Sequence, residues 1–157
     1  MAGMPTWVED AVRGGMLPAL VALATSCGTT GPEDSLPAGA VAMEAPAHFA
    51  EWWGATESCA GLGGSFARVE WFVVPGVSSF PTEVGEKVGL WVKRGERRAI
   101  VIAEGYLGHE MVVRHEMLHD LLSREGHPEP YFTERCGLTW ETWQGTGGTE
   151  LAAGHLH

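Results

Sequence analysis

The residues with the clearest chemical potential are His115, Glu116 and His119, which form the pattern H-E-x-x-H. The segment from Glu110 to Arg124 contains neither Gly nor Pro, so we expect one continuous helix there. Residues four apart on a helix lie one turn above each other, so both imidazoles point the same way. They can then bind the same divalent ion, with Glu116 beside them to hold a metal-bound water.

The setting of this motif is apolar, with Met117 and Leu118 inside it and valines and leucines on both sides. An alternative is that the two histidines only cap a buried face and hydrogen-bond to the backbone. Two imidazoles and a carboxylate in an apolar stripe would be costly without a partner. This cost favours a metal site.

In these residues the chain resembles the zincin metallopeptidases, whose active-site helix carries H-E-x-x-H among apolar neighbours. The resemblance covers about twenty residues and implies a third protein ligand, which one zincin branch places six residues after the second His. Here that position is Glu125. Asp120 also departs from the zincin pattern, and we expect it to pair with Arg124 one helical turn later.

The leading candidate for the third ligand is His127, which follows Gly126 and precedes Pro128. A helix that ends in a left-handed Gly reverses direction at that point. Glu129 and Glu134 are the alternatives, because other zincin branches use a downstream Glu. The resemblance implies Zn²⁺ as the metal.

The composition indicates one globular domain with a substantial core, since 45% of the 157 residues are hydrophobic and only 19% are charged. The formal net charge is −10, and no basic run is longer than Arg97-Arg98. These features argue against nucleic acid or anionic lipid as the main partner.

The N-terminal segment has the order of a bacterial lipoprotein signal. Arg13 precedes a short apolar stretch, Met16 to Ala24, and small residues then lead to Cys27. We therefore expect residues 1–26 to be a signal and Cys27 to be acylated, with translation starting as late as Val12. A cytosolic N-terminal helix with a buried Cys27 is the alternative.

The two other cysteines are Cys59 and Cys136, an even set once Cys27 carries lipid. In an oxidising compartment the economical expectation is a disulfide between them, and two buried free thiols are the alternative. Residues 27–40 are rich in Gly and Pro and predict a flexible tether, and residues 145–157 predict a flexible tail.

The folded domain is expected over residues 41–144, as an α+β fold with a small mixed sheet. A helix is predicted from Pro46 to about Cys59, and strands at 67–74, 88–92 and 99–103, with Gly95 in a hairpin turn between the last two. Residues 77–86 are expected to be a loop. The resemblance to zincins implies that the strand at 100–104 forms the sheet edge beside the catalytic cleft, where it can pair with an extended peptide.

The sequence therefore favours a zinc-dependent peptidase tethered by lipid to the membrane outside the cytoplasm, on the periplasmic or extracellular side. In the expected mechanism Zn²⁺ lowers the pKa of a bound water, and Glu116 takes its proton during attack on a peptide carbonyl. Tyr106 or Tyr131 is a candidate donor to the oxyanion. The competing function is a non-catalytic scaffold that acts as an accessory subunit of a larger membrane complex.

Overall fold

The structure is a computed structural model that describes residues 36–145. The expected signal, Cys27 and nearly all of the expected tail lie outside these residues. Leu36 and Ala40, which the sequence places in the tether, pack against the hydrophobic core. Within residues 36–145, no helix is long and apolar enough to cross a membrane.

A four-stranded mixed sheet forms the base of the fold, in the order β1-β2-β6-β5. Its strands are β1 (Val41–Ala42), β2 (Val69–Val74), β5 (Gly89–Arg94) and β6 (Arg97–Ala103). β6 runs parallel to β2 and antiparallel to β5, and β1 runs antiparallel to β2. The expected α+β class with a small mixed sheet is confirmed.

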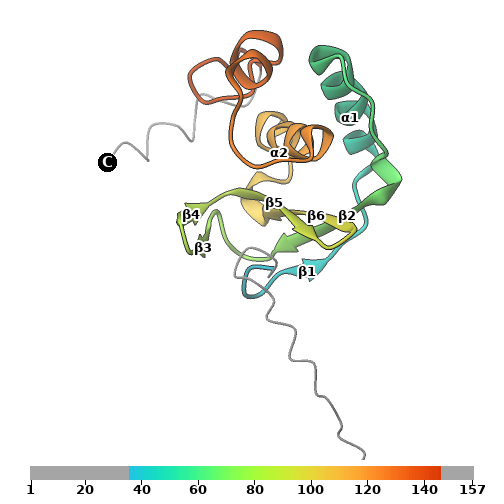
Figure 1. Ribbon diagram of the computed structural model, residues 1–157. Coiled ribbons are helices and arrows are strands. Elements are labelled where there is room, and N and C mark those ends of the chain that lie inside the picture. Colours follow the sequence, from blue (N-terminus) through green and yellow to red (C-terminus); the bar gives the residue numbers. More distant parts are fainter. Residues whose placement is uncertain (1–35, 146–157) are drawn as a thin grey trace, which may run out of the picture.

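Two helices, α1 (Ala47–Ala60) and α2 (Glu110–Leu122), lie on the same side of this sheet (Figure 1). α1 begins after Pro46, as expected from the fixed φ of proline at a helix start. Shorter helical turns are η2 (Phe66–Arg68), η3 (Glu104–Tyr106) and the π-helix η4 (Pro130–Arg135). α2 packs on β5 and β6, so its lower face is held against the sheet.

The expectation that residues 100–104 form the sheet edge was wrong. β6 is a central strand, and residues Ala99 to Ala103 are fully buried. A run of consecutive apolar residues is typical of a strand that is covered on both faces. β5 therefore lies at the edge, joined to β6 by a tight turn in which Gly95 has a φ of 62°.

The expected loop at 77–86 contains a second hairpin, formed by β3 (Phe80–Thr82) and β4 (Gly85–Lys87). Each strand has three residues and one of them is Pro81, so neither shows the alternation that marks a longer strand. Gly85 adopts a φ of 112° after the turn. This hairpin leads directly into the edge strand β5.

α2 ends two residues earlier than expected, because Ser123 adopts a left-handed conformation with a φ of 50°. Arg124 therefore leaves the helix, and the expected pair between Asp120 and Arg124 does not form. Asp120 is buried instead. It accepts a hydrogen bond of 2.9 Å from the Trp91 indole and forms an ion pair of 3.3 Å with Arg98.

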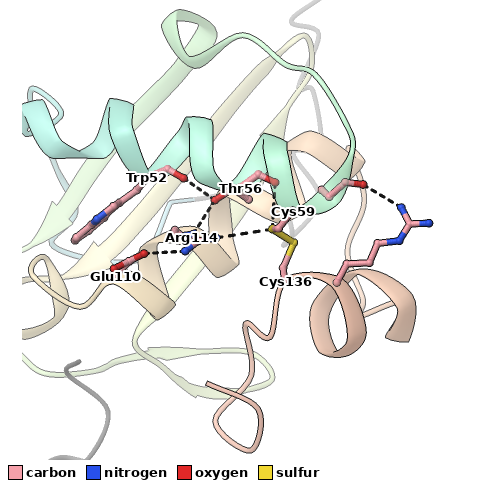
Figure 2. The surroundings of a disulfide bond; sticks show 8 residues. Trp52, Thr56, Cys59, Glu110, Arg114 and Cys136 are labelled. Carbon is pink, nitrogen blue, oxygen red and sulfur yellow. Dashed lines mark hydrogen bonds and ion pairs between the residues drawn. A yellow bond between two sulfur atoms is a disulfide. The ribbon is translucent and has the colours of Figure 1, made fainter. Parts of the chain in front are cut away.

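The expected disulfide between Cys59 and Cys136 is confirmed, with the two Cα atoms 5.1 Å apart. It joins the last turn of α1 to the segment after η4. Figure 2 shows the Arg114 side chain beside it, reaching from α2 to α1. Arg114 forms an ion pair of 2.7 Å with Glu110 and donates a 3.1 Å hydrogen bond to the Thr56 hydroxyl.

Reduction of this disulfide is expected to lower the free energy of unfolding by about 4 kcal/mol, because the bond restricts the unfolded chain over a long loop. The measurement is urea unfolding with and without reductant. A Cys59→Ser, Cys136→Ser double variant should match the reduced parent and show no further response to reductant. Equal stability of parent and double variant would contradict the expectation.

Candidate metal centre

Three histidines lie close together above the edge of the sheet. His115 and His119 come from consecutive turns of α2, and His127 comes from the loop that follows it. One ring nitrogen of each lies within 4.8 Å of the other two, and the Nε2 atoms of His115 and His127 are 2.9 Å apart. Three nitrogens around one tetrahedral zinc lie about 3.3 Å apart. The group can therefore hold a metal ion.

Backbone carbonyls orient two of these rings. The Nδ1 atom of His115 lies 2.7 Å from the Leu138 carbonyl, and that of His119 lies 3.1 Å from the Arg124 carbonyl. A carbonyl only accepts, so Nδ1 carries the proton in both rings and donates. Nε2 of each neutral ring then has a free lone pair. Protein metal sites commonly fix their histidines through the second ring nitrogen in this way.

Phe132 of η4 packs against all three imidazoles. It is fully buried, and its ring centroid lies 4.8 Å from that of each histidine. The Trp91 indole also lies nearly parallel to the His119 ring, with the two centroids 6.4 Å apart. These two aromatic side chains shield part of the histidine rings from water and limit their rotation.

The same burial keeps the imidazoles neutral. Desolvation lowers the pKa of His115 to about 4 and that of His119 to about 3, and it also lowers the pKa of His127. An uncharged imidazole is the form that binds a metal ion. At neutral pH the group therefore needs no deprotonation before it binds metal.

Glu116 lies on the side of α2 that faces the edge strand and is 7% exposed. Burial raises the pKa of its carboxyl to about 8, and a backbone hydrogen bond from Trp91 opposes this shift. At neutral pH this shift keeps much of the Glu116 carboxyl protonated in the metal-free protein, and a nearby cation favours the ionised form that acts as a base. Glu116 follows His115 directly in the chain, so it has the type and position of a general base.

Gly89 at the start of β5 makes room for this carboxylate. A Cβ atom built on Gly89 would lie 2.8 Å from Oε1 of Glu116 and 2.9 Å from its Cγ. These contacts are closer than real Cβ atoms make, so any larger residue at this position must displace the Glu116 side chain.

On the peptidase hypothesis from the sequence, Gly89→Ala is expected to reduce peptide turnover at least tenfold while metal content stays at the parent level, because it moves Glu116 and leaves the histidines in place. Peptide turnover and metal analysis on the same preparation measure the two effects. Gly54→Ala is the matched control, since a Cβ there meets no atom within 4 Å. Parent-level turnover in Gly89→Ala would show that Glu116 does not need this space.

A cleft of about 1480 Å³ runs along the edge strand and contains the site. Its lining includes the three histidines and Glu116, together with residues of β5 and of the β3–β4 hairpin. Trp140, which is 49% exposed, and Val84, which is 80% exposed, also line it. The site is thus open to a large ligand.

The structure also places the remaining candidates from the sequence. Glu129 and Glu134 are exposed and lie outside the histidine group. Tyr106 lines the cleft, whereas Tyr131 does not and lies against the Arg135 guanidinium, 4.9 Å from its ring.

Four contributors to the site could not be predicted, because no pattern in the nearby sequence marks them. The Leu138 carbonyl is a backbone group, and Gly89 contributes by having no side chain. Phe132 is one apolar residue in a polar segment. Lys87 also lines the cleft, but it lies between the expected loop at 77–86 and the expected strand at 88–92.

Compared with known proteins, the chain matches no protein-family model, no curated protein and no solved structure.

Proposed function

We propose that this chain is a zinc-dependent peptidase of zincin type. The observation that carries the proposal is the convergence of His115, His119 and His127 beside a buried Glu116 in an open cleft. Metal binding alone requires no general base. The combination therefore favours hydrolysis over a structural metal site.

The donor set fits zinc. Three neutral imidazoles are a common ligand set for catalytic zinc, which leaves one position open for water or substrate. When bound, zinc acts as a Lewis acid that lowers the pKa of a water molecule and polarises a carbonyl. The chain itself supplies the orientation of the rings, through the carbonyls of Leu138 and Arg124.

Glu116 carries out the proton transfers in the proposed reaction. Its carboxylate takes a proton from the water as the water oxygen attacks the peptide carbonyl carbon. The same proton then passes to the amide nitrogen, which leaves as an amine when the C–N bond breaks. A hydrogen bond from the Trp91 backbone holds the Glu116 carboxylate against the edge strand.

The edge position of β5 supports an extended peptide as the substrate. The Ala103 N–H donates to the Val88 carbonyl at 2.9 Å, so residue 88 directs its backbone groups toward β6. By alternation, Gly89, Trp91 and Lys93 direct theirs away from β6. Because the Trp91 N–H already donates to Glu116, a peptide in the cleft can add to this edge by main-chain hydrogen bonds only at the other outward groups.

We further propose that the domain acts outside the cytoplasm, anchored in the cell envelope by lipid on Cys27. The disulfide between Cys59 and Cys136 supports an oxidising compartment. Mass spectrometry of protein taken from its native cells tests the anchor. A lipidated Cys27 is expected at the N-terminus, and an intact peptide that covers Met1 would exclude it.

The test of the peptidase proposal is a peptide-library digest by the zinc-loaded domain. Cleavage is expected with zinc, none after chelation, and recovery when zinc is added back. Mass spectrometry of the products identifies the cleaved bonds. Absence of cleavage by protein that carries one zinc per chain would reject the peptidase and leave the scaffold function.

A further inference from the structure

Lys87, at the end of β4, is a cationic side chain placed beside the proposed catalytic groups. It lines the same cleft as the three histidines and Glu116. Among the lysines and arginines whose side chains are described in residues 36–145, only Lys87 lines this cleft. The cleft therefore has a single positive charge close to its metal-binding side.

The ammonium group of Lys87 is available for a ligand. Its side chain is half-buried, and the ion pairs within residues 36–145 do not include it. Burial is the main cause of the pKa shifts of the three histidines and Glu116, and the charge of Lys87 contributes a downward effect to each. Lys87 is thus within electrostatic range of all four groups.

The first residues of the edge strand face α2. The side chain of Trp91 reaches Asp120 of α2, and a Cβ on Gly89 would meet Glu116 of the same helix. A bend at Val88 separates these β5 positions from Lys87 of β4, so the placement of Lys87 follows from its position in the lining of the same cleft.

The other charges of the cleft indicate what kind of anion Lys87 meets. Four exposed glutamates line the cleft, namely Glu83, Glu86, Glu125 and Glu141. They repel carboxylates of an incoming peptide, so a free carboxylate is a poor partner for Lys87. A peptide carbonyl is neutral when the peptide binds, so the glutamates do not repel it. Its oxygen becomes negative only during the reaction, when Lys87 can stabilise that charge.

We infer that Lys87 is a catalytic residue of the proposed peptidase, whose Nζ donates a hydrogen bond to the oxyanion of the tetrahedral intermediate. This inference rests on the proposed function. As the bond between the water oxygen and the carbonyl carbon forms, the π electrons of the C=O bond move to its oxygen, and the water proton goes to Glu116. Lys87 keeps its own proton and stabilises the oxyanion until the C–N bond breaks.

The test uses zinc-loaded protein and a peptide substrate with an amidated C-terminus and no acidic residues. Lys87→Met keeps the apolar stem and removes the charge, and it is expected to lower kcat roughly 100-fold with little change in KM, the scale seen when one oxyanion donor is lost. Lys87→Arg should recover part of this loss. Arg68→Met is the control, because it removes a positive charge from an exposed η2 residue that does not line the cleft.

A binding measurement makes the result independent of activity. A peptide phosphonamidate, which carries a tetrahedral anion, should bind the zinc-loaded parent roughly 100-fold more tightly than Lys87→Met by calorimetry. Equal phosphonamidate affinity would overturn the inference, as would a KM effect confined to peptides with free carboxylates. If the parent cleaves no peptide, the proposed function fails, and the calorimetry still decides whether Lys87 binds the tetrahedral anion.

Discussion

Glu116→Gln is expected to lower peptide turnover by roughly 100-fold or more while zinc content and folding stay at the parent level. Glutamine is nearly isosteric with glutamate and keeps an oxygen that accepts the Trp91 backbone hydrogen bond, but it cannot take a proton from water. The side chain is buried and its carboxylate is not among the metal-binding atoms, so the change removes the base alone. Single-turnover kinetics and metal analysis measure both properties.

Glu129→Gln is the matched control for this experiment. Glu129 is exposed, lies near the site in sequence and does not line the cleft, so its loss removes the same charge without a catalytic effect. If Glu116→Gln cleaves peptides as fast as the parent, the activity belongs to another group or to a contaminant.

Loss of two imidazoles is expected to remove the metal entirely. The purified parent should carry about one zinc per chain, and the His115→Ala, His119→Ala double variant should carry none, since one histidine cannot hold the ion alone. Zinc added to chelator-treated parent should raise the Tm, because the ion binds only the folded state. The double variant should show no such shift. Metal content by atomic absorption provides the direct measurement.

His127→Ala also tests whether the histidines bind the metal, and it disturbs packing less, since His127 is exposed whereas His119 is only 8% exposed. It is expected to weaken zinc affinity and to leave the Tm of the metal-free protein unchanged. His48→Ala, on the exposed face of α1, is the control. Full zinc occupancy in the double variant would exclude the histidine site.

The parts of the site that follow from short-range rules could be predicted from the sequence. The helical repeat places His115 and His119 on one face, and the turn at Gly95 joins two strands whatever lies around them. The disulfide follows from the number of cysteines together with their expected compartment. Each of these inferences depends on residues close together in the chain or on the number of cysteines.

The parts that depend on long-range pairing could not be predicted. Whether β5 or β6 forms the edge is decided by the parallel pairing of β6 with β2, which lies about thirty residues earlier in the chain. The partners of Asp120 are Trp91 and Arg98 from two strands that pack under α2, and not Arg124 as expected. No local pattern reports such contacts.

The disulfide also determines what happens to the molecule after a single break in its chain. Cys59 and Cys136 enclose every proposed ligand, Glu116 and the β3–β4 hairpin, whose tip residue Val84 is 80% exposed. If a protease nicks that tip, the two pieces remain one covalent molecule, and the fragment that begins at the nick still carries all three histidines. Such nicked protein migrates as one species without reductant and as two with it, so the cut does not release the half that carries the histidines.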